Sequence, residues 1–403
     1  MYHAVRVEWP CLSFDFLRDA LGANRTRFPH TVTLVAGTQA DRADRNKLTL
    51  LKLSHLHCQR KEHDSDSEGS DDGSEDSNGS DAEDQEPVVE HTSVAHAGGV
   101  NRVRSMPQQP HIVASWAETG KVHIWDLQRQ LAALEAGTTN SKSATGTTKP
   151  AYTLLSHPDE GFAMDWSPVE AGQLATGDSA GNVFLCRAAK GGWTADPSPF
   201  LGHAGSVEDL QWSPSERTVF ASASADRTVA IWDTRRKGGS MLKVEAHGSD
   251  VNVIAWNRGV HFLLASGADD GGFKVWDLRS FGGKGGSGAL PEPVAMFSFH
   301  AAPITSVEWH TTDDSMLAVT GADNQLTVWD LSVEADDDEA AAAAADSGDG
   351  DGGAGGAAFP AQLMFVHQGQ RDIKELHYHP QVPGVIMSTA EDGFNIFKPA
   401  ISA

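Results

Sequence analysis

One spacing recurs four times along this chain: a histidine is followed 29 residues later by a tryptophan and then an aspartate. The four pairs are His96 with Trp125, His203 with Trp232, His247 with Trp276, and His300 with Trp329. Self-similarity at a fixed spacing is typical of repeat architectures, in which each unit supplies one supersecondary element. The spacing therefore predicts a repeat protein.

Two further copies keep the histidine but lose the Trp-Asp ending. His157 leads to Cys186 in GNVFLC, and His367 leads to Phe397 in FNIFK. Each unit also holds an alternating run closed by an aromatic residue, such as VEDLQW, and then a run of small residues, such as VFASAS. Runs of this kind between turn residues indicate short β-strands. We expect four antiparallel strands per unit.

The N-terminal part of the chain supplies a seventh unit. LSFDF, TVTLVAGT, KLTLLKL and PVVEHTSV predict four strands there, while the last unit stops after FNIFK and lacks an outer strand. The segment YHAVRV, residues 2–7, precedes the first unit, and we predict that it pairs with the last one and removes a sheet edge. The predicted fold is all-β: a single seven-bladed WD-repeat β-propeller over residues 1–403, closed by an N-terminal strand.

Histidine, serine or threonine, and aspartate recur together, and the aspartates six residues before a tryptophan are Asp226, Asp270 and Asp323. With the tryptophan, such a set can form one buried hydrogen-bonded chain. Because the set recurs from unit to unit, whereas an active site would occur once, we interpret it as structural. The sequence contains no nucleophile elbow, phosphate-binding loop or metal-ligand spacing. We therefore expect a non-catalytic protein with no metal and no cofactor.

The formal net charge of −24 favours basic partners and opposes direct binding to nucleic acid or to acidic membranes. The three cysteines, Cys11, Cys58 and Cys186, lie far apart, so they predict neither disulfides nor a zinc site and fit a reducing compartment. We expect a monomer without a membrane-spanning segment.

Two acidic tracts interrupt the repeats: residues 62–86 in the first blade, and the Ala/Gly-rich residues 333–358 in the sixth. We expect both to be disordered, apart from a short helix in EADDDEAAAAAA, because their few apolar residues cannot offset the ordering entropy. Each tract is either a solubilising loop or a mobile polyanion that shields a basic client. The acids proposed for the second role are Asp71, Asp72, Glu75, Asp76, Asp336, Asp337, Asp338 and Glu339.

Several segments resemble one branch of the propeller proteins. EWPCLSFDFLRDALG with AGTQAD, the block VNRVRSMPQQPHIVASW, and FVHQGQRDIKELHYHP after the second tract are similar to the glutamate-rich WD-repeat proteins, relatives of the retinoblastoma-binding histone chaperones. The resemblance covers nearly the whole chain. It implies a protein of the nucleus and nucleolus that binds histones and basic ribosomal proteins, as a chaperone in large ribosomal subunit biogenesis and in chromatin.

Residues five positions after the repeat histidines are expected just before the first strand of each blade, on the rim of the central channel. In the histone-binding relatives such positions hold a basic histone tail, and carboxylates there can form charge-assisted hydrogen bonds with arginine or lysine. Gly99 and Pro303 replace acids of the relatives, and ordinary loop capping remains the alternative role. The residues that fit the pattern are Asn101, Glu160, Phe162, Glu208, Asn252 and Glu391.

A second functional class rests on WDTR, which ends at Arg235, and WDLR, which ends at Arg279. Both strings match the W-D-x-R pattern of propellers that dock on a cullin-ligase adaptor. The alternative function is therefore a substrate receptor of a cullin-RING ubiquitin ligase. Arginine is also common after Trp-Asp in propeller blades, so a purely structural role stays open.

Overall fold

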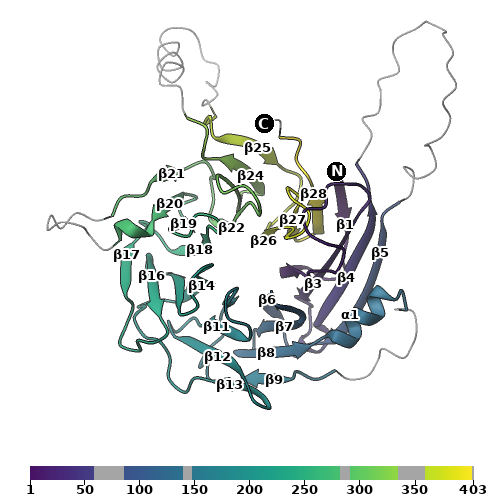
Figure 1. Cartoon of the computed structure of the whole chain (residues 1–403), viewed down its shortest axis with the longest axis horizontal. Coiled ribbons are helices and arrows are strands. Elements are labelled where there is room, and N and C mark those ends of the chain that lie inside the picture. The colour runs from purple at the N-terminus through teal and green to yellow at the C-terminus, as the bar shows by residue number, and fades with distance from the viewer. Residues whose placement is uncertain (59–85, 139–147, 282–290, 335–358, 402–403) are drawn as a thin grey trace, which may run out of the picture.

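The computed structural model describes residues 1–58, 86–138, 148–281, 291–334 and 359–401. These residues form seven four-stranded antiparallel sheets, which Figure 1 shows arranged around a central opening. The predicted seven-bladed WD-repeat β-propeller is confirmed.

In blades 1 to 6 the strands follow the chain from the channel outward. Blades 1 to 3 are built from β2 (Cys11–Phe16), β3 (His30–Thr38), β4 (Lys47–Leu56) and β5 (Val88–Ala95); β6 (Val100–Met106), β7 (Gln109–Ala117), β8 (Lys121–Asp126) and β9 (Tyr152–Leu154); and β10 (Ala163–Trp166), β11 (Gln173–Gly177), β12 (Val183–Ala189) and β13 (Gly192–Ala195). Blades 4 to 6 are built from β14 (Val207–Trp212), β15 (Val219–Ser224), β16 (Thr228–Asp233) and β17 (Leu242–Glu245); β18 (Val251–Trp256), β19 (Leu263–Ala268), β20 (Phe273–Asp277) and β21 (Ala295–Phe297); and β22 (Ile304–Trp309), β23 (Met316–Gly321), β24 (Gln325–Asp330) and β25 (Leu363–His367).

Blade 7 contains β26 (Glu375–Tyr378), β27 (Ile386–Ala390) and β28 (Gly393–Phe397), and β1 (Tyr2–Val5) is its outer strand. The register pairs Tyr2 with Phe397 and Val5 with Phe394, and Figure 1 shows β1 beside β28. The predicted closing strand is confirmed, but it ends at Val5 rather than Val7. Its partner β28 begins at Gly393, and the pairing therefore stops at Val5.

The small-residue strands lie where neighbouring blades approach most closely. A Cβ atom on Gly177 of β11 would lie 2.6 Å from Cγ1 of Val207, the first residue of the next blade, and Gly267 of β19 meets Ile304 in the same way at 2.5 Å. Larger side chains at these positions would push the first strands apart. The runs of small residues therefore set how tightly the blades pack around the channel.

The recurring polar set forms the expected chain most completely in blade 4. Ser222 Oγ lies 2.6 Å from Nε2 of His203 and accepts from Nε1 of Trp232 at 2.7 Å, while Asp226 lies 3.0 Å from Nδ1 of His203. Burial acts to raise the pKa of Asp226, but hydrogen bonds from His203, Thr228 and Lys243 outweigh it and hold this pKa well below its ordinary value. The set fixes the outer strands to the loop before the blade, as the structural interpretation predicts.

Other blades depart from this arrangement. In blade 5, His247 bonds Ser266 at 2.7 Å, but Asp270 caps its own turn through the backbone N–H of Gly272. Nδ1 of His247 therefore has no partner among the described residues, and burial lowers the pKa of His247 to about 4. In blade 6, Thr327 of β24 takes the role that Ser222 has on β15.

Within the part of the chain that the structure describes, helical structure is confined to short connections. The helix α1 (Gln128–Glu135) joins β8 to β9 and buries Leu134 against blade 1, and the 3-10 turns η1 (Ala43–Arg45) and η3 (Leu278–Ser280) cap two loops. Among the described residues, no helix is long and apolar enough to span a membrane. The gaps at 59–85 and 335–358 fall between β4 and β5 and between β24 and β25, so the expected disorder and helix of the acidic tracts lie outside the described residues.

Candidate functional site

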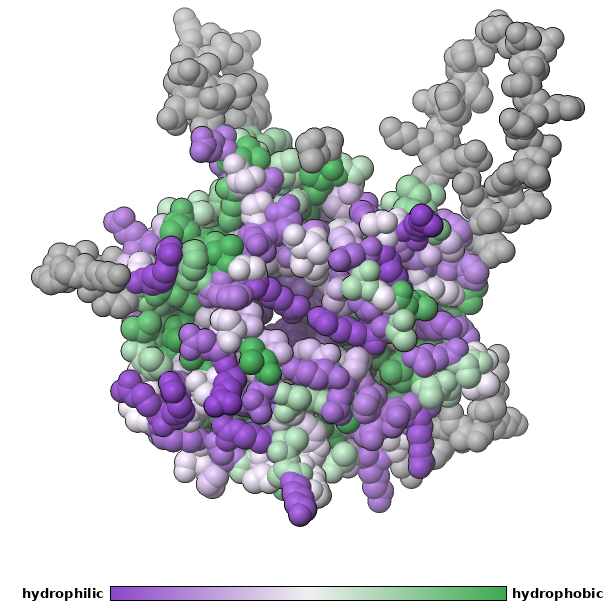
Figure 2. Space-filling model, viewed as in Figure 1, coloured by the Kyte–Doolittle hydropathy of each residue, from purple (hydrophilic) through white to green (hydrophobic). Residues whose placement is uncertain are grey.

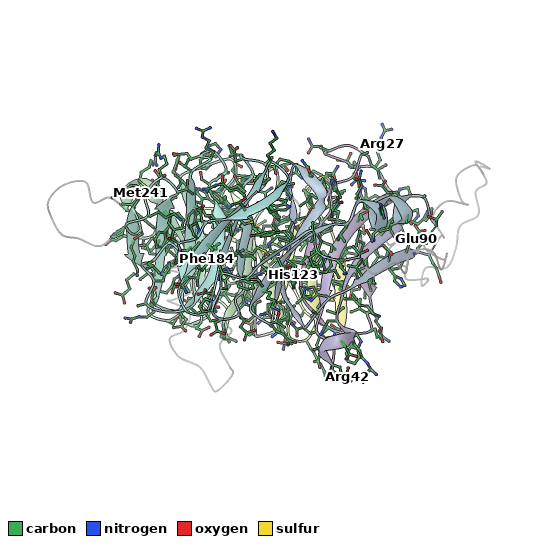
Figure 3. The ribbon with its side chains drawn as sticks, turned by 90° about the horizontal axis from the view of Figure 1, so that it is seen from below. Arg27, Arg42, Glu90, His123, Phe184 and Met241 are labelled. Atoms are coloured by element: carbon green, nitrogen blue, oxygen red, sulfur yellow. The ribbon has the colours of Figure 1, made fainter. Side chains whose placement is uncertain are left out.

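The central channel has two mouths, one on each face of the disc. Figure 3 shows Arg27, in the loop between β2 and β3, and Arg42, in the loop between β3 and β4, on opposite faces. The backbone N–H of Gly98 donates to the carbonyl of Ala43 at 3.2 Å, which places the start of β6 on the Arg42 face. The first strand of every blade thus starts at the Arg42 face and ends at the Arg27 face.

Three of the predicted rim residues meet at the Arg42-face mouth. Asn101 of β6 donates from Nδ2 to Glu160 at 3.0 Å and to the carbonyl of Gly161 at 3.4 Å. Phe162 is half-buried beside them, and its carbonyl accepts from Nε of Arg102 at 2.8 Å. Blades 2 and 3 therefore present one carboxylate, one amide and one aromatic ring side by side.

The acceptors continue into blades 4 and 5. Nδ2 of Asn252 donates to Asp269 at 2.8 Å and to the carbonyl of Ile304 at 3.2 Å. Burial raises the pKa of the half-buried Glu208, against the effects of Ser206 and Arg102, and the charges of Asp250 and Asp269 add to the rise. The carboxylates therefore repel one another, and a cation bound among them would stabilise their ionised forms.

The structure corrects the expected position of these residues within the blades. Asn101, Glu208 and Asn252 are the second residues of β6, β14 and β18 rather than residues before the strands, because each strand already begins at the preceding valine. Glu391 lies exposed in the turn between β27 and β28, where its backbone N–H donates to the carbonyl of Arg371 at 2.9 Å. No side-chain contact within the described residues joins Glu391 to the other five.

Sequence reasoning missed two acids at this mouth. Asp250 immediately precedes β18, and Asp269 immediately follows β19. Neither stands five residues after a repeat histidine, which was the only rule applied. The turn after the second strand of each blade also reaches the mouth, so Asp269 was detectable once that turn was placed.

A buried ion cluster stands in the channel between the two mouths. Glu375 of β26 accepts from Arg102 and from Arg104, each at 2.7 Å, and its side chain is 1% exposed. His377 lies 2.6 Å from Glu308 and 3.6 Å from Glu375. We call these five residues the channel ion cluster.

Charge compensation sets the ionisation of this cluster. Burial alone would raise the pKa of Glu375, but the charges of Arg104, His377 and Arg102 hold it well below its ordinary value. Burial alone would lower the pKa of His377, yet Glu308 and Glu375 raise it to about 10. The sequence contained HYH at residues 377–379, but only the ring closure brings His377 to Glu308 and Glu375.

The two W-D-x-R arginines lie at the ends of β16 and β20, hence toward the Arg27 face. The guanidinium of Arg235 pairs with Asp233, and that of Arg279 pairs with Asp277. Both arginine side chains remain largely exposed, at 73% and 65%. The two sites share one geometry in consecutive blades, away from the rim residues.

Other predicted features are outside what can be placed. Within the described residues, no group of three or more His, Cys, Asp or Glu side chains is arranged to hold a metal ion. The proposed client-contacting acids of the two tracts all lie outside the described residues: Asp71, Asp72, Glu75, Asp76, Asp336, Asp337, Asp338 and Glu339.

Two family models match the chain. Residues 1–57 match the family described as histone-binding protein RBBP4 or a component of the CAF1 complex. Residues 197–233, 238–277 and 291–330 match "WD domain, G-beta repeat", and these segments cover the three most regular Trp-Asp repeats.

Several curated proteins are similar over almost the whole chain. The ribosome assembly protein rrb1 of Schizosaccharomyces pombe is 48% identical over 99% of this chain and 79% of its own length. The glutamate-rich WD repeat-containing protein 1 of Dictyostelium discoideum is 47% identical over 100% of this chain and 80% of its own length. Protein HEAT STRESS TOLERANT DWD 1 of Arabidopsis thaliana is 47% identical over 98% of this chain and 86% of its own length.

Proposed function

Because this chain belongs to the family of the glutamate-rich WD-repeat proteins and the ribosome assembly protein rrb1, we propose that it is a non-catalytic chaperone that binds basic ribosomal proteins and histones. Ribosome assembly in the name of one relative, and histone binding in the description of the N-terminal family model, support a nuclear and nucleolar role. The clients are proposed to bind at the Arg42-face mouth.

One observation carries this proposal: the acceptors at that mouth are partly buried and, among the described residues, form no ion pair with a cation. Glu160 already accepts from Asn101, and Glu208 lies near Asp250 and Asp269. Lysine or arginine of a client would add charge-assisted hydrogen bonds, which are stronger than neutral ones. The net charge of −24 would also speed the encounter with a basic client, and high salt would weaken it.

The rim can be tested with a matched pair of variants. Glu160→Gln with Glu208→Gln removes two rim charges, whereas Glu170→Gln with Glu216→Gln removes two exposed charges from the turns after β10 and β14, in the same blades but on the Arg27 face. Titration calorimetry with purified core histones and with a basic ribosomal protein should show binding weakened at least about tenfold by the rim pair and little changed by the control pair.

Equal losses in both pairs would mean that only the overall charge matters, and the rim proposal would fail. Deletion of residues 62–86 tests the tract separately. If the tract shields the client, its deletion weakens binding further; if it is a solubilising loop, affinity is unchanged while the rim variants still lose binding.

The exposure of Arg235 and Arg279 supports a second candidate function, docking on the adaptor of a cullin-RING ligase. The two arginines face away from the rim, so both roles are compatible. Arg235→Ala with Arg279→Ala should abolish adaptor capture in a pull-down while the thermal unfolding midpoint stays the same. Unchanged capture would remove these arginines from that role.

A further inference from the structure

The channel mouth on the Arg27 face opens into a cavity of about 470 Å³. This volume falls within the roughly 300–1,000 Å³ of small-ligand sites. Residues at the ends of the first strands of all seven blades line the cavity, and Arg102, Arg104 and His377 of the channel ion cluster lie at its inner end. Figure 2 shows this face of the disc, with hydrophilic side chains around the central hollow.

Two arginines from distant parts of the chain stand at this cavity. Arg18 follows β2 in blade 1, and Arg258 follows β18 in blade 5. Among the described residues, neither guanidinium has a hydrogen-bond or ion-pair partner, in contrast to Arg235 and Arg279, which fold back onto aspartates. Burial and the charge of Arg258 both lower the pKa of Arg18. Two like charges thus share one opening without a counter-ion from the described part of the chain.

The deeper wall offers acceptors instead. Asp165 accepts from the backbone N–H of Trp212 at 2.7 Å, and burial raises its pKa to about 7, against this bond and the charge of Arg104. Asp209 accepts from the backbone N–H of Ile254 at 3.0 Å. A carboxylate has about four lone-pair sites, so both residues retain capacity for hydroxyl or amine donors. A second anionic group this deep would be repelled.

From this polarity we propose that the cavity binds a small phosphate monoester that also carries hydroxyl or amino groups. The phosphate lies between Arg18 and Arg258, and the donors of the ligand face Asp165 and Asp209. Planar guanidinium groups match the geometry of phosphate oxygens, and a dianion neutralises both arginines at once. This site goes beyond the proposed chaperone function, because it lies on the opposite face from the rim residues.

The test uses the full chain and glucosamine 6-phosphate as the probe, in titration calorimetry at constant ionic strength. We expect saturable binding that is tighter than the binding of inorganic phosphate or of glucosamine. Arg18→Ser and Arg258→Ser should each weaken it by about tenfold or more. Arg27→Ser is the matched control, since Arg27 is exposed on the same face but does not line the cavity, and it should bind as the parent does.

A further variant tests the orientation. Asp165→Asn should weaken the binding of glucosamine 6-phosphate more than that of inorganic phosphate. Equal effects on both ligands would reject the role of the carboxylate.

Other results would overturn the proposal as a whole. Absence of saturable binding, or an equal loss in Arg27→Ser, would show that the cavity is no phosphate site. Tighter binding of an aspartate-rich peptide to the same two arginines would make the occupant an acidic protein segment instead. The rim variants Glu160→Gln and Glu208→Gln should leave the phosphate affinity unchanged, so failure here and failure of the chaperone proposal are distinguishable.

Discussion

Glu375 on β26 accepts a hydrogen bond from the backbone N–H of Phe14 on β2 at 2.8 Å, and so joins the last blade to the first. The same device recurs around the channel. Asp15 accepts from the N–H of Ser105 at 2.7 Å, and Asp165 accepts from that of Trp212 at 2.7 Å. Side chains thus satisfy backbone donors at the inner edges of the blades, where the strand ladder ends. The ring is held at its inner edge by these bonds and at its outer edge by β1.

Replacing Glu375 should therefore be costly. Glu375→Gln leaves the largely buried charges of Arg102 and Arg104 without their shared partner, and removing one member of a buried ion pair typically costs about 3–5 kcal/mol. Urea unfolding measures the loss. Glu391→Gln, at an exposed position, should change the free energy of unfolding by less than about 0.5 kcal/mol. Similar values for the two variants would contradict the assigned role of the cluster.

His377 should make stability fall at alkaline pH. Its folded pKa of about 10 exceeds the unfolded value near 6.5, so its contribution is complete below about pH 6.5 and is lost as the pH rises through 10. The free energy of unfolding should decline between about pH 7 and 9.5 in the parent protein and decline less steeply in His377→Gln. Parallel pH profiles would show that His377 is neutral in the folded state.

The incomplete polar set of blade 5 allows a paired comparison. His203 is bonded at both ring nitrogens, whereas His247 is bonded only at Nε2 within the described residues. His203→Gln should destabilise the protein by about 1 kcal/mol more than His247→Gln, because it also breaks the bond to Asp226. Thermal and urea unfolding of both variants measure the difference. A greater loss in His247→Gln would refute this interpretation.

The closing strand can be broken without deleting it. Tyr2→Pro with Ala4→Pro removes two backbone donors from β1 and should expose the edge of β28. We expect a lower thermal midpoint and self-association in light scattering. Tyr2→Ser with Ala4→Ser keeps both N–H groups and should remain monodisperse. Association of both variants would point to the lost side chains rather than the lost ladder.

The repeat spacing was enough to predict the blades, because each unit carries its own strand pattern and its own histidine and tryptophan. The missing outer strand after Phe397 likewise predicted the pairing of β1, and one offset from the histidines placed Asn101 and Glu208 at one mouth. These features depend on local pattern or on periodicity. Both are visible in a single sequence.

The remaining features depend on contacts between unrelated positions. Arg102 and Glu375 are 273 residues apart and occupy no shared repeat position, so nothing in the sequence pairs them. Asp270 stands at the expected spacing, yet its carboxylate prefers the N–H of Gly272 over His247. Such choices are decided by turn geometry and ring closure, which the repeat pattern does not encode.

Site-specific photocrosslinking tests the central claim, that a basic client sits on the Arg42 face. A photoreactive amino acid would be placed at Arg371, whose carbonyl bonds Glu391 on that face, and in a second protein at Glu170, in the turn after β10 on the opposite face. With a purified core histone or basic ribosomal protein as the partner, we predict crosslinks from position 371 and few from position 170. Crosslinks chiefly from position 170 would contradict the account.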